Sequence, residues 1–363
     1  MGPARPVRAA TRVAITRADE ARRPALTVAW VGPRPAWLEH DDAVAELVGI
    51  KLSDAAVASA AELVVVDRSA VGEIDQLRKS APRSLIALDL TDEEDVELSP
   101  PELRRARAAD VLVAGSRWEL GEICRRLPSP LPRTAVVPRP LDLDWYAPEP
   151  VLAETKGRGR DLRRFRRFHR LAGPTVLFAG PYTESGGLDM VVEAVLRLRE
   201  KMPDVRLAAI PHGPIDPRYR DRCEMRALGL GHHGIIEWDP PESEVPFWYG
   251  IAAVVCSPCR QPASPEPAKR AAAAARPFVG SDLESFREHV DEGTTGNLVP
   301  VDEPAALEAA LRRLLDAEDE QTRLGDAARR KAESDYSPRA AARALRHEWS
   351  SSLETRSSAS RGG

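Results

Sequence analysis

The chain has 363 residues, which is enough for two domains of ordinary size. Its 52 Lys and Arg residues against 56 Asp and Glu residues give a formal net charge of −4, which argues against a nucleic-acid-binding protein. Hydrophobic residues make up 43% of the chain and exclude a largely disordered protein.

The N-terminal residues 1–25 are rich in arginine and lack the apolar core of a signal peptide, so we expect a disordered basic extension. No apolar run in the sequence approaches the roughly 18–20 residues of a membrane-spanning helix. Four cysteines are too few for a disulfide framework in so long a chain and indicate a reducing compartment. We therefore expect a cytoplasmic protein.

Short apolar runs separated by polar, helix-like stretches begin at residue 26. The runs lack the alternation of a half-exposed strand, which is typical of strands buried on both faces of a parallel sheet. The expected strands are residues 26–31, 62–66, 84–90, 110–114 and 134–137, and the expected helices are residues 69–81 and 100–108. Residues 26–150 are therefore predicted to form a Rossmann-like α/β domain, which we expect to be shortened.

The same pattern restarts after residue 173 and predicts a second Rossmann-like domain at residues 173–335. Its expected strands are residues 175–179, 205–210, 235–238, 252–257, 278–281 and 298–301. Its expected helices are residues 187–201, 217–228, 285–290, 304–316 and 320–334. A helix at 336–350 is expected to return towards the first domain, followed by a disordered tail at 351–363 that is rich in Ser, Gly and Arg.

Between the two domains, residues 151–172 are predicted to form a basic linker helix, with eight basic residues and one acid between positions 156 and 170. Leu162, Phe165, Phe168 and Leu171 recur every third residue along one side of that helix. It can dock on its own domains, lie on an anionic membrane surface or bind a polyanion or protein partner. The surface residues in the last two cases would be Arg163, Arg164, Arg166 and Arg167.

The segment TVLFAGPYTESGGLD, residues 175–189, is a buried strand that ends in Gly180, followed by a polar turn and a helix after Gly187. A glycine turn that leads into a helix aims backbone N–H groups and the positive end of the helix dipole at one point. This arrangement suits a phosphate, although glycines at such a turn are common without any ligand.

Five segments in order resemble the retaining glycosyltransferases of family 4, which have two Rossmann-like domains facing each other across a cleft (the GT-B architecture). They are VVPRPLDLDWYAPEP, VLFAGPYTESGGLDMVVEAV, VRLAAIPHGP, HHGIIEWDPPESEVPFWYGIAAVVCSP and PFVGSDLESFREHVDEGTTGNLVPVDEPAALEAAL. The resemblance covers roughly residues 105–345. It implies transfer of a hexose from a nucleotide-sugar, with no metal and no other cofactor required.

The chain differs from this family at the positions that bind the donor and take part in catalysis. The Arg and Lys that hold the donor diphosphate in the family correspond here to Pro181 and Gly186. The family's Glu-x7-Glu pair falls in the segment SPCRQPASPEPAKRAAAAARPFV, where Gln261 and Arg270 take the two positions and Glu266 is the only carboxylate. Arg270 reverses a charge, but its guanidinium, like that of Arg276, could hold a phosphate instead.

The resemblance implies a donor site at the carboxyl ends of the second sheet. Its residues are Gly180, Tyr182, Thr183, Gly187, His212, Gly213, Gln261, Arg270 and Glu288. Weak catalytic candidates are Glu266 and Asp89, with Thr91 as the alternative to Asp89 at the same strand end. A strand-end Asp that caps the next turn is the more common case.

Two other groups of residues have structural explanations as well as functional ones. Cys256 and Cys259 could form half of a zinc site with His232 and His233, but no second ligand pair of the usual spacing is present, so we expect no metal. The aromatic residues Trp238, Phe247, Trp248 and Tyr249 could stack on a base or sugar, yet such clusters more often pack a strand–helix junction.

Two functions therefore stay open. The chain is either a glycosyltransferase that uses a nucleotide-sugar, or a non-catalytic homologue that binds a ligand or stabilises a protein partner such as an active paralogue. The first is favoured by the series of motifs and the second by the replaced charged residues. A peripheral association with the membrane would accompany either function if the linker helix lies on lipid.

Overall fold

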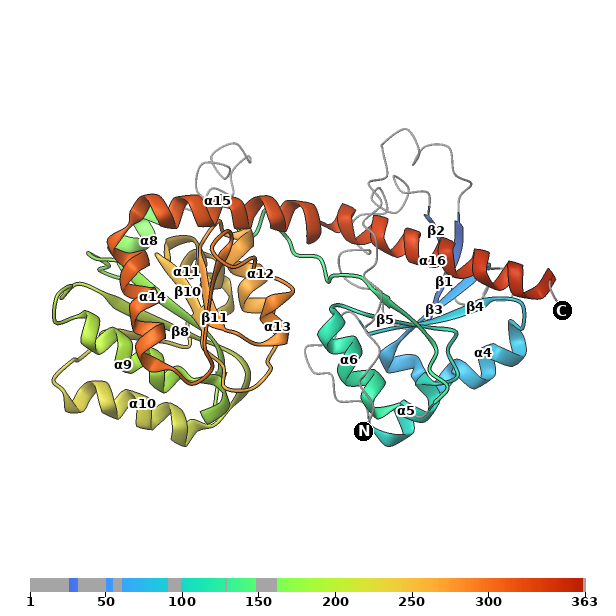
Figure 1. The fold of residues 1–363 in the computed structure, drawn as a ribbon, viewed down its shortest axis with the longest axis horizontal. Coiled ribbons are helices and arrows are strands. Elements are labelled where there is room, and N and C mark those ends of the chain that lie inside the picture. Colours follow the sequence, from blue (N-terminus) through green and yellow to red (C-terminus); the bar gives the residue numbers. More distant parts are fainter. Residues whose placement is uncertain are drawn as a thin grey trace.

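The structure, a computed structural model, describes residues 26–31, 50–54, 61–90, 99–127, 129–147 and 162–361. These residues form two α/β domains, each built on a six-stranded parallel sheet (Figure 1). The predicted fold class, two Rossmann-like domains, is confirmed. The expected basic extension at 1–25, the first half of the linker and Thr91 lie outside the described residues.

The N-terminal sheet has the strand order β2-β1-β3-β4-β5-β6. Its strands are β1 (Leu26–Val31), β2 (Ile50–Asp54), β3 (Leu63–Asp67), β4 (Leu85–Asp89), β5 (Val111–Ala114) and β6 (Arg133–Val136). Five of them agree with the expected strands, but β2 is not among the predictions. It lies at the edge of the sheet, and its sequence IKLSD alternates polar and apolar residues instead of forming the continuous apolar run of a central strand.

Short helices cover one face of this sheet and the end of the chain covers the other. The helices are η2 (Arg68–Glu73), α4 (Ile74–Ser80), α5 (Pro100–Ala106) and α6 (Arg117–Arg126). Ile74 and Ile123 pack with Val64 and Val66 of β3 on the first face. Alternate residues of the same strand, among them Val65, pack on the opposite face with α16 (Pro338–Arg361).

The C-terminal sheet has the strand order β12-β11-β10-β7-β8-β9. Its strands are β7 (Thr175–Tyr182), β8 (Arg206–Ile215), β9 (Ile236–Trp238), β10 (Val254–Ser257), β11 (Phe278–Ser281) and β12 (Gly296–Val299). One face packs against α9 (Leu188–Leu198), α10 (Pro217–Gly229) and α14 (Pro304–Asp316). The other packs against α8 (Leu162–Phe168), α11 (Val245–Ile251), α12 (Glu266–Ala273) and α15 (Glu318–Asp335). Three short elements, η3 (Glu184–Gly186), η4 (Glu242–Glu244) and α13 (Glu284–Arg287), complete this domain.

The linker helix docks on the C-terminal domain through part of its apolar side. Leu162 and Phe165 are buried, and the Phe165 ring stacks on Phe247 at 5.0 Å between centroids. Phe168, however, is 78% exposed, so its expected place on the docked side is wrong. A spacing of three residues falls 60° short of a full helical turn at each step, and α8 ends at Phe168 before the series is complete.

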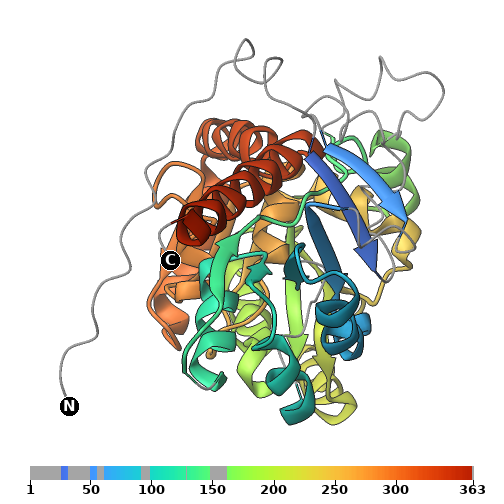
Figure 2. The ribbon, with the colours of Figure 1, turned by 90° about the vertical axis from the view of Figure 1, so that its right-hand side faces the viewer.

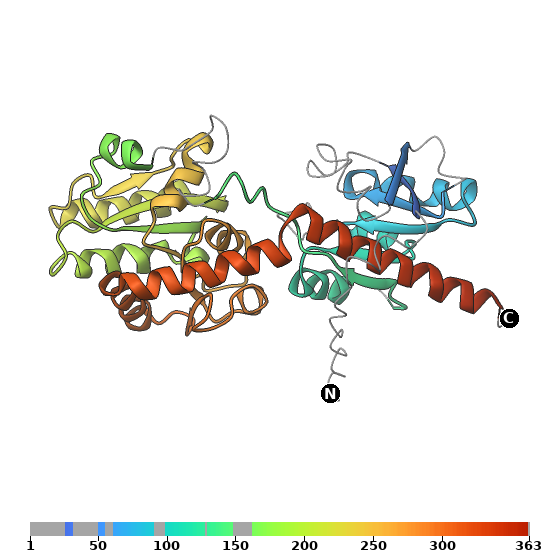
Figure 3. The ribbon, with the colours of Figure 1, turned by 90° about the horizontal axis from the view of Figure 1, so that it is seen from above.

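The chain crosses from the second domain to the first between α15 and the C-terminal helix α16 (Pro338–Arg361), which lies along the first domain (Figures 1 and 3). The α16 residues Ala341, Leu345 and Trp349 are buried against the N-terminal sheet, which confirms the expected return of the chain. Figure 2 shows α16 lying across the strands of that sheet. None of the helices among the described residues is long and apolar enough to cross a membrane.

The tail expected to be disordered from residue 351 is instead helical as far as Arg361. Ser352 Oγ donates to the carbonyl of Glu348 at 2.8 Å, which satisfies its hydroxyl within the helix. Arg133 of β6 donates to Ser351 Oγ and to Thr355 Oγ1, both at 2.8 Å. Contacts with the first domain therefore outweigh the serine-rich composition that suggested disorder.

Candidate functional site

The glycine turn between β7 and α9 is built by close packing of backbone segments. Gly187 has φ +75° and is the N-cap residue of α9. A Cβ on Gly186 would lie 1.9 Å from the carbonyl oxygen of Pro181, and one on Gly187 would lie 2.2 Å from that of Pro258. Side chains are therefore excluded at both positions. The packing brings the start of α9 next to Pro258, which directly follows β10.

Arg260 links the two sides of this turn through hydrogen bonds and neutralises the carboxylates beside it. Its guanidinium makes two hydrogen bonds to the Asp189 carboxylate, at 2.9 and 2.8 Å, and a third of 2.6 Å to Asp302. It also donates to the carbonyl of Glu184 at 2.7 Å. These bonds raise the pKa of Arg260 and keep its charge paired. Arg260 is not among the residues predicted from the sequence, because 71 positions separate it from Asp189 and no local pattern links them.

Several of the expected donor-site residues lie around the same turn. Thr183 Oγ1 and Ser185 Oγ are 2.9 Å apart within it. A Cβ on Gly180 would approach the Phe178 ring to 3.1 Å, and Gly213 has φ +101° beside the Pro181 ring. Tyr182 does not belong with them: it is fully buried in the core and its ring lies 6.0 Å from that of Trp238. Its side chain points into the core of the domain and not towards the expected donor site, whereas the preceding Pro181 is half-buried.

The loop before α12 carries two further expected residues. His212 Nε2 and Ser264 Oγ are 3.1 Å apart, so His212 of β8 contacts this loop rather than standing alone. Gln261 is exposed. The loop therefore joins the ends of β8 and β10, where the family resemblance places the donor.

The first turns of α12 hold a buried ion-pair group. Glu266 is 6% exposed and accepts from Lys269 Nζ at 3.0 Å and from Arg270 Nε at 3.4 Å. Burial alone would raise the pKa of Glu266, but Lys269, Arg270 and Arg139 together lower it to about 2. Glu266 is therefore an ionised carboxylate surrounded by cations. Lys269 and Arg139 are not among the residues predicted from the sequence, although the i, i+3 spacing of Glu266 and Lys269 is present in the segment EPAKR.

The two arginines that could hold a phosphate both have contacts within the protein. Arg270 pairs with Glu266 and its guanidinium lies 5.9 Å from the centre of the Tyr146 ring. Arg276 donates to the carbonyl of Gly250 at the end of α11. Arg270 is partly exposed and stays a candidate donor contact, whereas Arg276 ties α11 to the domain.

Glu288 lies where the two domains meet. Its carboxylate accepts from the backbone N–H of Arg117 at 2.8 Å, in the first turn of α6 of the N-terminal domain. Glu119 lies in the same turn, and burial raises its pKa, with Lys269 acting in the opposite direction and Glu288 in the same one. Charged side chains from both domains therefore lie at the boundary beside Glu288, one of the expected donor-site residues.

A buried histidine, His289, directly follows Glu288 in the chain. His289 Nδ1 and the Tyr336 hydroxyl are 2.9 Å apart, and His289 is 7% exposed. Burial first, and then Lys269 and Lys331, lower the pKa of His289 to about 3. The imidazole is therefore neutral at ordinary pH.

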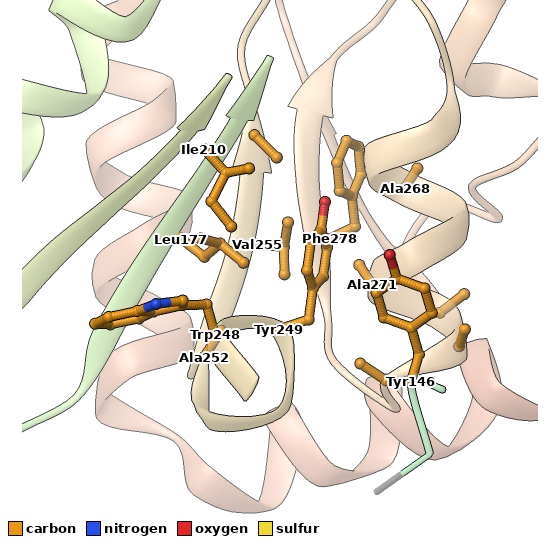
Figure 4. Close-up of a cluster of buried hydrophobic side chains, with 14 of the residues drawn as sticks. Tyr146, Leu177, Ile210, Trp248, Tyr249, Ala252, Val255, Ala268, Ala271 and Phe278 are labelled. Atoms are coloured by element: carbon orange, nitrogen blue, oxygen red, sulfur yellow. The ribbon is translucent and has the colours of Figure 1, made fainter. Parts of the chain in front are cut away.

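The aromatic and cysteine groups belong to the core. Trp248 and Tyr249 of α11 are each 1% exposed and pack beneath β7 and β10, together with Leu177 and Val255 (Figure 4). All four cysteines are free thiols, and Cys256 and Cys259 are fully buried. The structural explanation of both groups is the one that the packing supports.

The catalytic candidate Asp89 is 5% exposed at the end of β4. It belongs to the N-terminal domain, whereas Glu266 belongs to the C-terminal domain.

Residues 173–317 match the model of the family described as glycosyl transferases group 1. The matched residues include the glycine turn, α12 and Glu288. The chain carries a group 1 glycosyltransferase domain on a GT-B fold. The family resemblance found in the sequence is thereby confirmed.

Among curated proteins, the D-inositol 3-phosphate glycosyltransferase of Streptomyces scabiei is 28% identical to this glycosyltransferase-like chain over 240 residues, which are 64% of the chain and 52% of the relative. The phosphatidyl-myo-inositol mannosyltransferase of Mycolicibacterium smegmatis is 32% identical over 180 residues, which are 49% of the chain and 42% of the relative. The chain thus spans about half the length of the first of these relatives.

Among solved structures, a glycosyltransferase from Rickettsia africae matches with a TM-score of 0.68 at 13% identity, covering 91% of this chain and 99% of that one. Anabaena Alr3699/HepE in complex with UDP and glucose matches with a TM-score of 0.66 at 14% identity, covering 90% of this chain and all of that one. At these identities the likeness concerns the fold.

Proposed function

We propose that the chain transfers a hexose from a nucleotide-sugar to an acceptor, with retention of the anomeric configuration. The observation that carries the proposal is the contact between Glu288 and Arg117. It puts the residue that resembles the family's donor-side acid at the boundary of two Rossmann-like domains, and such folds bind ligands outside the carboxyl ends of their strands. The group 1 family match and the UDP and glucose bound by the Anabaena protein support the same substrate class.

In this proposal the donor lies beyond the ends of β7, β8 and β10. Thr183, Gly187 and Gly213 border the turn before α9, and the positive end of the α9 helix dipole would face the diphosphate. The remaining donor contacts would be Gly180, His212, Gln261, Arg270 and Glu288. We do not propose Glu266 as a catalytic group, because two cations already occupy its carboxylate. Asp89 stays a prediction.

Calorimetric titration of the full chain with UDP-, GDP- and ADP-hexoses tests this function, followed by an assay for hydrolysis of whichever donor binds. We expect micromolar binding of one donor and slow release of its sugar with retained configuration. Glu288→Gln should weaken that binding. Glu284→Gln, which changes an exposed residue of the same helix, is the matched control and should bind as the unmodified chain does. If no nucleotide-sugar binds to the folded chain, the proposal is wrong.

The second candidate is a non-catalytic homologue that acts as a scaffold for a ligand or a protein partner. The observation that favours it is the paired state of the charges: Glu266 with Lys269 and Arg270, and Arg260 with Asp189. Donor binding without hydrolysis or transfer to any acceptor would favour this candidate.

The predicted partners would bind at different places on the chain. The nucleotide-sugar would bind at the domain boundary, and a protein partner is expected only if the chain is a non-catalytic scaffold. The anionic membrane surface concerns α8, which lies on the C-terminal domain away from the N-terminal domain (Figures 1 and 3). A cytoplasmic location is part of the proposal, and fractionation of cells that express the chain would test it.

A further inference from the structure

The outer face of α8 gathers arginine side chains around one exposed aromatic ring. Phe168 is 78% exposed, more than any other large hydrophobic residue that the structure describes. Four exposed arginines neighbour it in the chain: Arg163, Arg164, Arg167 and Arg170. We call these five residues the α8 surface.

The inner face of α8 fixes this surface to the C-terminal domain. Phe165 packs against Phe247 and, edge to face at 5.1 Å, against Trp248. Leu162 and Leu171 are buried on either side of it. Because these contacts hold the helix in place, the outward arginines and Phe168 are presented together without a further folding step.

One arginine expected on this surface is turned away from it. Arg166 Nη2 donates to the carbonyl of Gly173 at 3.0 Å, which links the helix to the segment before β7. Arg170 has φ 53°, follows the end of the helix and is exposed. The structure thus replaces Arg166 by Arg170 in the charged face and adds Phe168.

The charge of the α8 surface is opposite to that of the whole chain. Four positive charges lie within eight residues of a protein whose formal net charge is −4. Among the described residues, two acids of neighbouring elements lie near His169 of this segment: Glu237 and Glu244 are 3.9 and 3.5 Å from its ring nitrogens. His169 is on the inner side, since its ring also packs against Trp248 at 4.8 Å.

We propose that the α8 surface docks the chain on an anionic lipid membrane. Arginines near a surface of anionic headgroups are attracted to it, and an exposed phenylalanine among them gains by entering the apolar edge of the bilayer. A single-stranded nucleic acid is the other polyanion to consider, but proteins that bind it present several aromatic rings to successive bases. The α8 surface has one aromatic ring. Because the α8 surface lies far from the domain boundary, that boundary stays accessible when the chain is docked on a membrane.

Co-sedimentation of the full chain with phosphatidylcholine vesicles, with and without added phosphatidylglycerol, tests the proposal. We expect binding only to the vesicles with phosphatidylglycerol, and a loss of binding as salt is raised. The double variant Arg163→Gln/Arg167→Gln should reduce partitioning by about 25-fold, at about fivefold for each charge. Phe168→Ser should reduce it by about tenfold.

Matched controls separate this surface from a general effect of charge or hydrophobicity. Arg104→Gln/Arg107→Gln removes two exposed arginines at α5 of the other domain, and Met225→Ser removes an exposed apolar side chain of α10. Both should bind vesicles as the unmodified chain does. Equal loss in test and control variants, no binding to phosphatidylglycerol, or retention of a single-stranded oligonucleotide in place of vesicles would each overturn the proposal. None of these outcomes depends on donor binding.

Discussion

The carboxylate of Glu288 accepts a hydrogen bond from the backbone N–H of Arg117, a residue 171 positions earlier in the chain and in the other domain. Arg117 is the first residue of α6, and Ser116 is its N-cap. Glu288 therefore adds negative charge at the positive end of that helix. The contact is a polar link between the two domains beside the proposed donor site.

Replacing Glu288 by Gln should loosen this link without breaking it completely. An amide oxygen can still accept from the Arg117 N–H, but the favourable interaction of a charge with the α6 dipole is lost, at about 0.3–1 kcal/mol. We expect a larger radius of gyration in small-angle X-ray scattering and a weaker dependence of that radius on salt. Glu284→Gln should leave the scattering unchanged. An identical curve for Glu288→Gln would mean that this contact does not hold the domains together.

Lys269 is required by the buried carboxylate of Glu266. Its Nζ lies 3.0 Å from Glu266 Oε2, and both side chains are less than a tenth exposed. Lys269→Met should cost about 3–5 kcal/mol in the free energy of unfolding, because it removes the closest cation from a buried anion. Denaturation in urea measures this cost.

The double variant Lys269→Met/Glu266→Gln provides the control for that interpretation. It removes the charge that Lys269 compensates, so it should regain a large part of the lost stability. If the loss of stability in the double variant equals the sum of the losses in the two single variants, the ion pair is not the cause. The lost stability would then come from the packing of the lysine side chain.

The neutral state of His289 predicts an acid-sensitive stability. Its pKa is about 3 in the folded chain against an ordinary 6.5. Between these values the unfolded chain binds a proton that the folded chain does not, so the free energy of unfolding falls as the pH falls below 6.5. Glu266 adds a similar loss only below its ordinary pKa of 4.5, because its folded pKa is about 2.

Between pH 6.5 and 4.5 the contribution of His289 can therefore be separated from that of Glu266. We expect urea denaturation at pH 6.5, 5.5 and 4.5 to show a smaller loss of stability for His289→Gln than for the unmodified chain. The same change at the exposed His233 should have no effect on the slope. Equal slopes for the chain and for His289→Gln would show that His289 is not the group responsible.

The sequence predicts the central strands and the longer helices because these have strong local patterns. Continuous apolar runs mark β3, β5 and β10, and α14 begins at Pro304, where a proline favours the start of a helix. The edge strand β2 has no such run. The end of α16 was mispredicted because the local composition does not contain the bonds from Arg133 that hold it.

The candidate site is less predictable than the fold because its residues meet from distant positions. The motif series located Glu288, His212 and the glycine turn, all of which lie at the ends of strands or helices. Pairings such as Arg260 with Asp189 depend on how β7 and β10 are placed side by side. Tyr182 was assigned to the site by its place in the motif, but strand geometry directs its side chain into the core.

The last residues of α16 should stabilise the N-terminal domain, although their composition, rich in Ser, Gly and Arg, is typical of a disordered tail. A chain that ends at residue 350 loses the hydrogen bonds from Arg133 to Ser351 and Thr355 and the bond from Arg356 to the carbonyl of Pro82. Since each such bond involves a charged donor, their loss should cost at least about 2 kcal/mol and lower the melting temperature. Hydrogen exchange should then show reduced protection of β6 but not of β10. Truncation after Arg361 is the matched control. If the chain that ends at residue 350 has the same melting temperature as this control and β6 keeps its protection, residues 351–361 of α16 do not stabilise the domain.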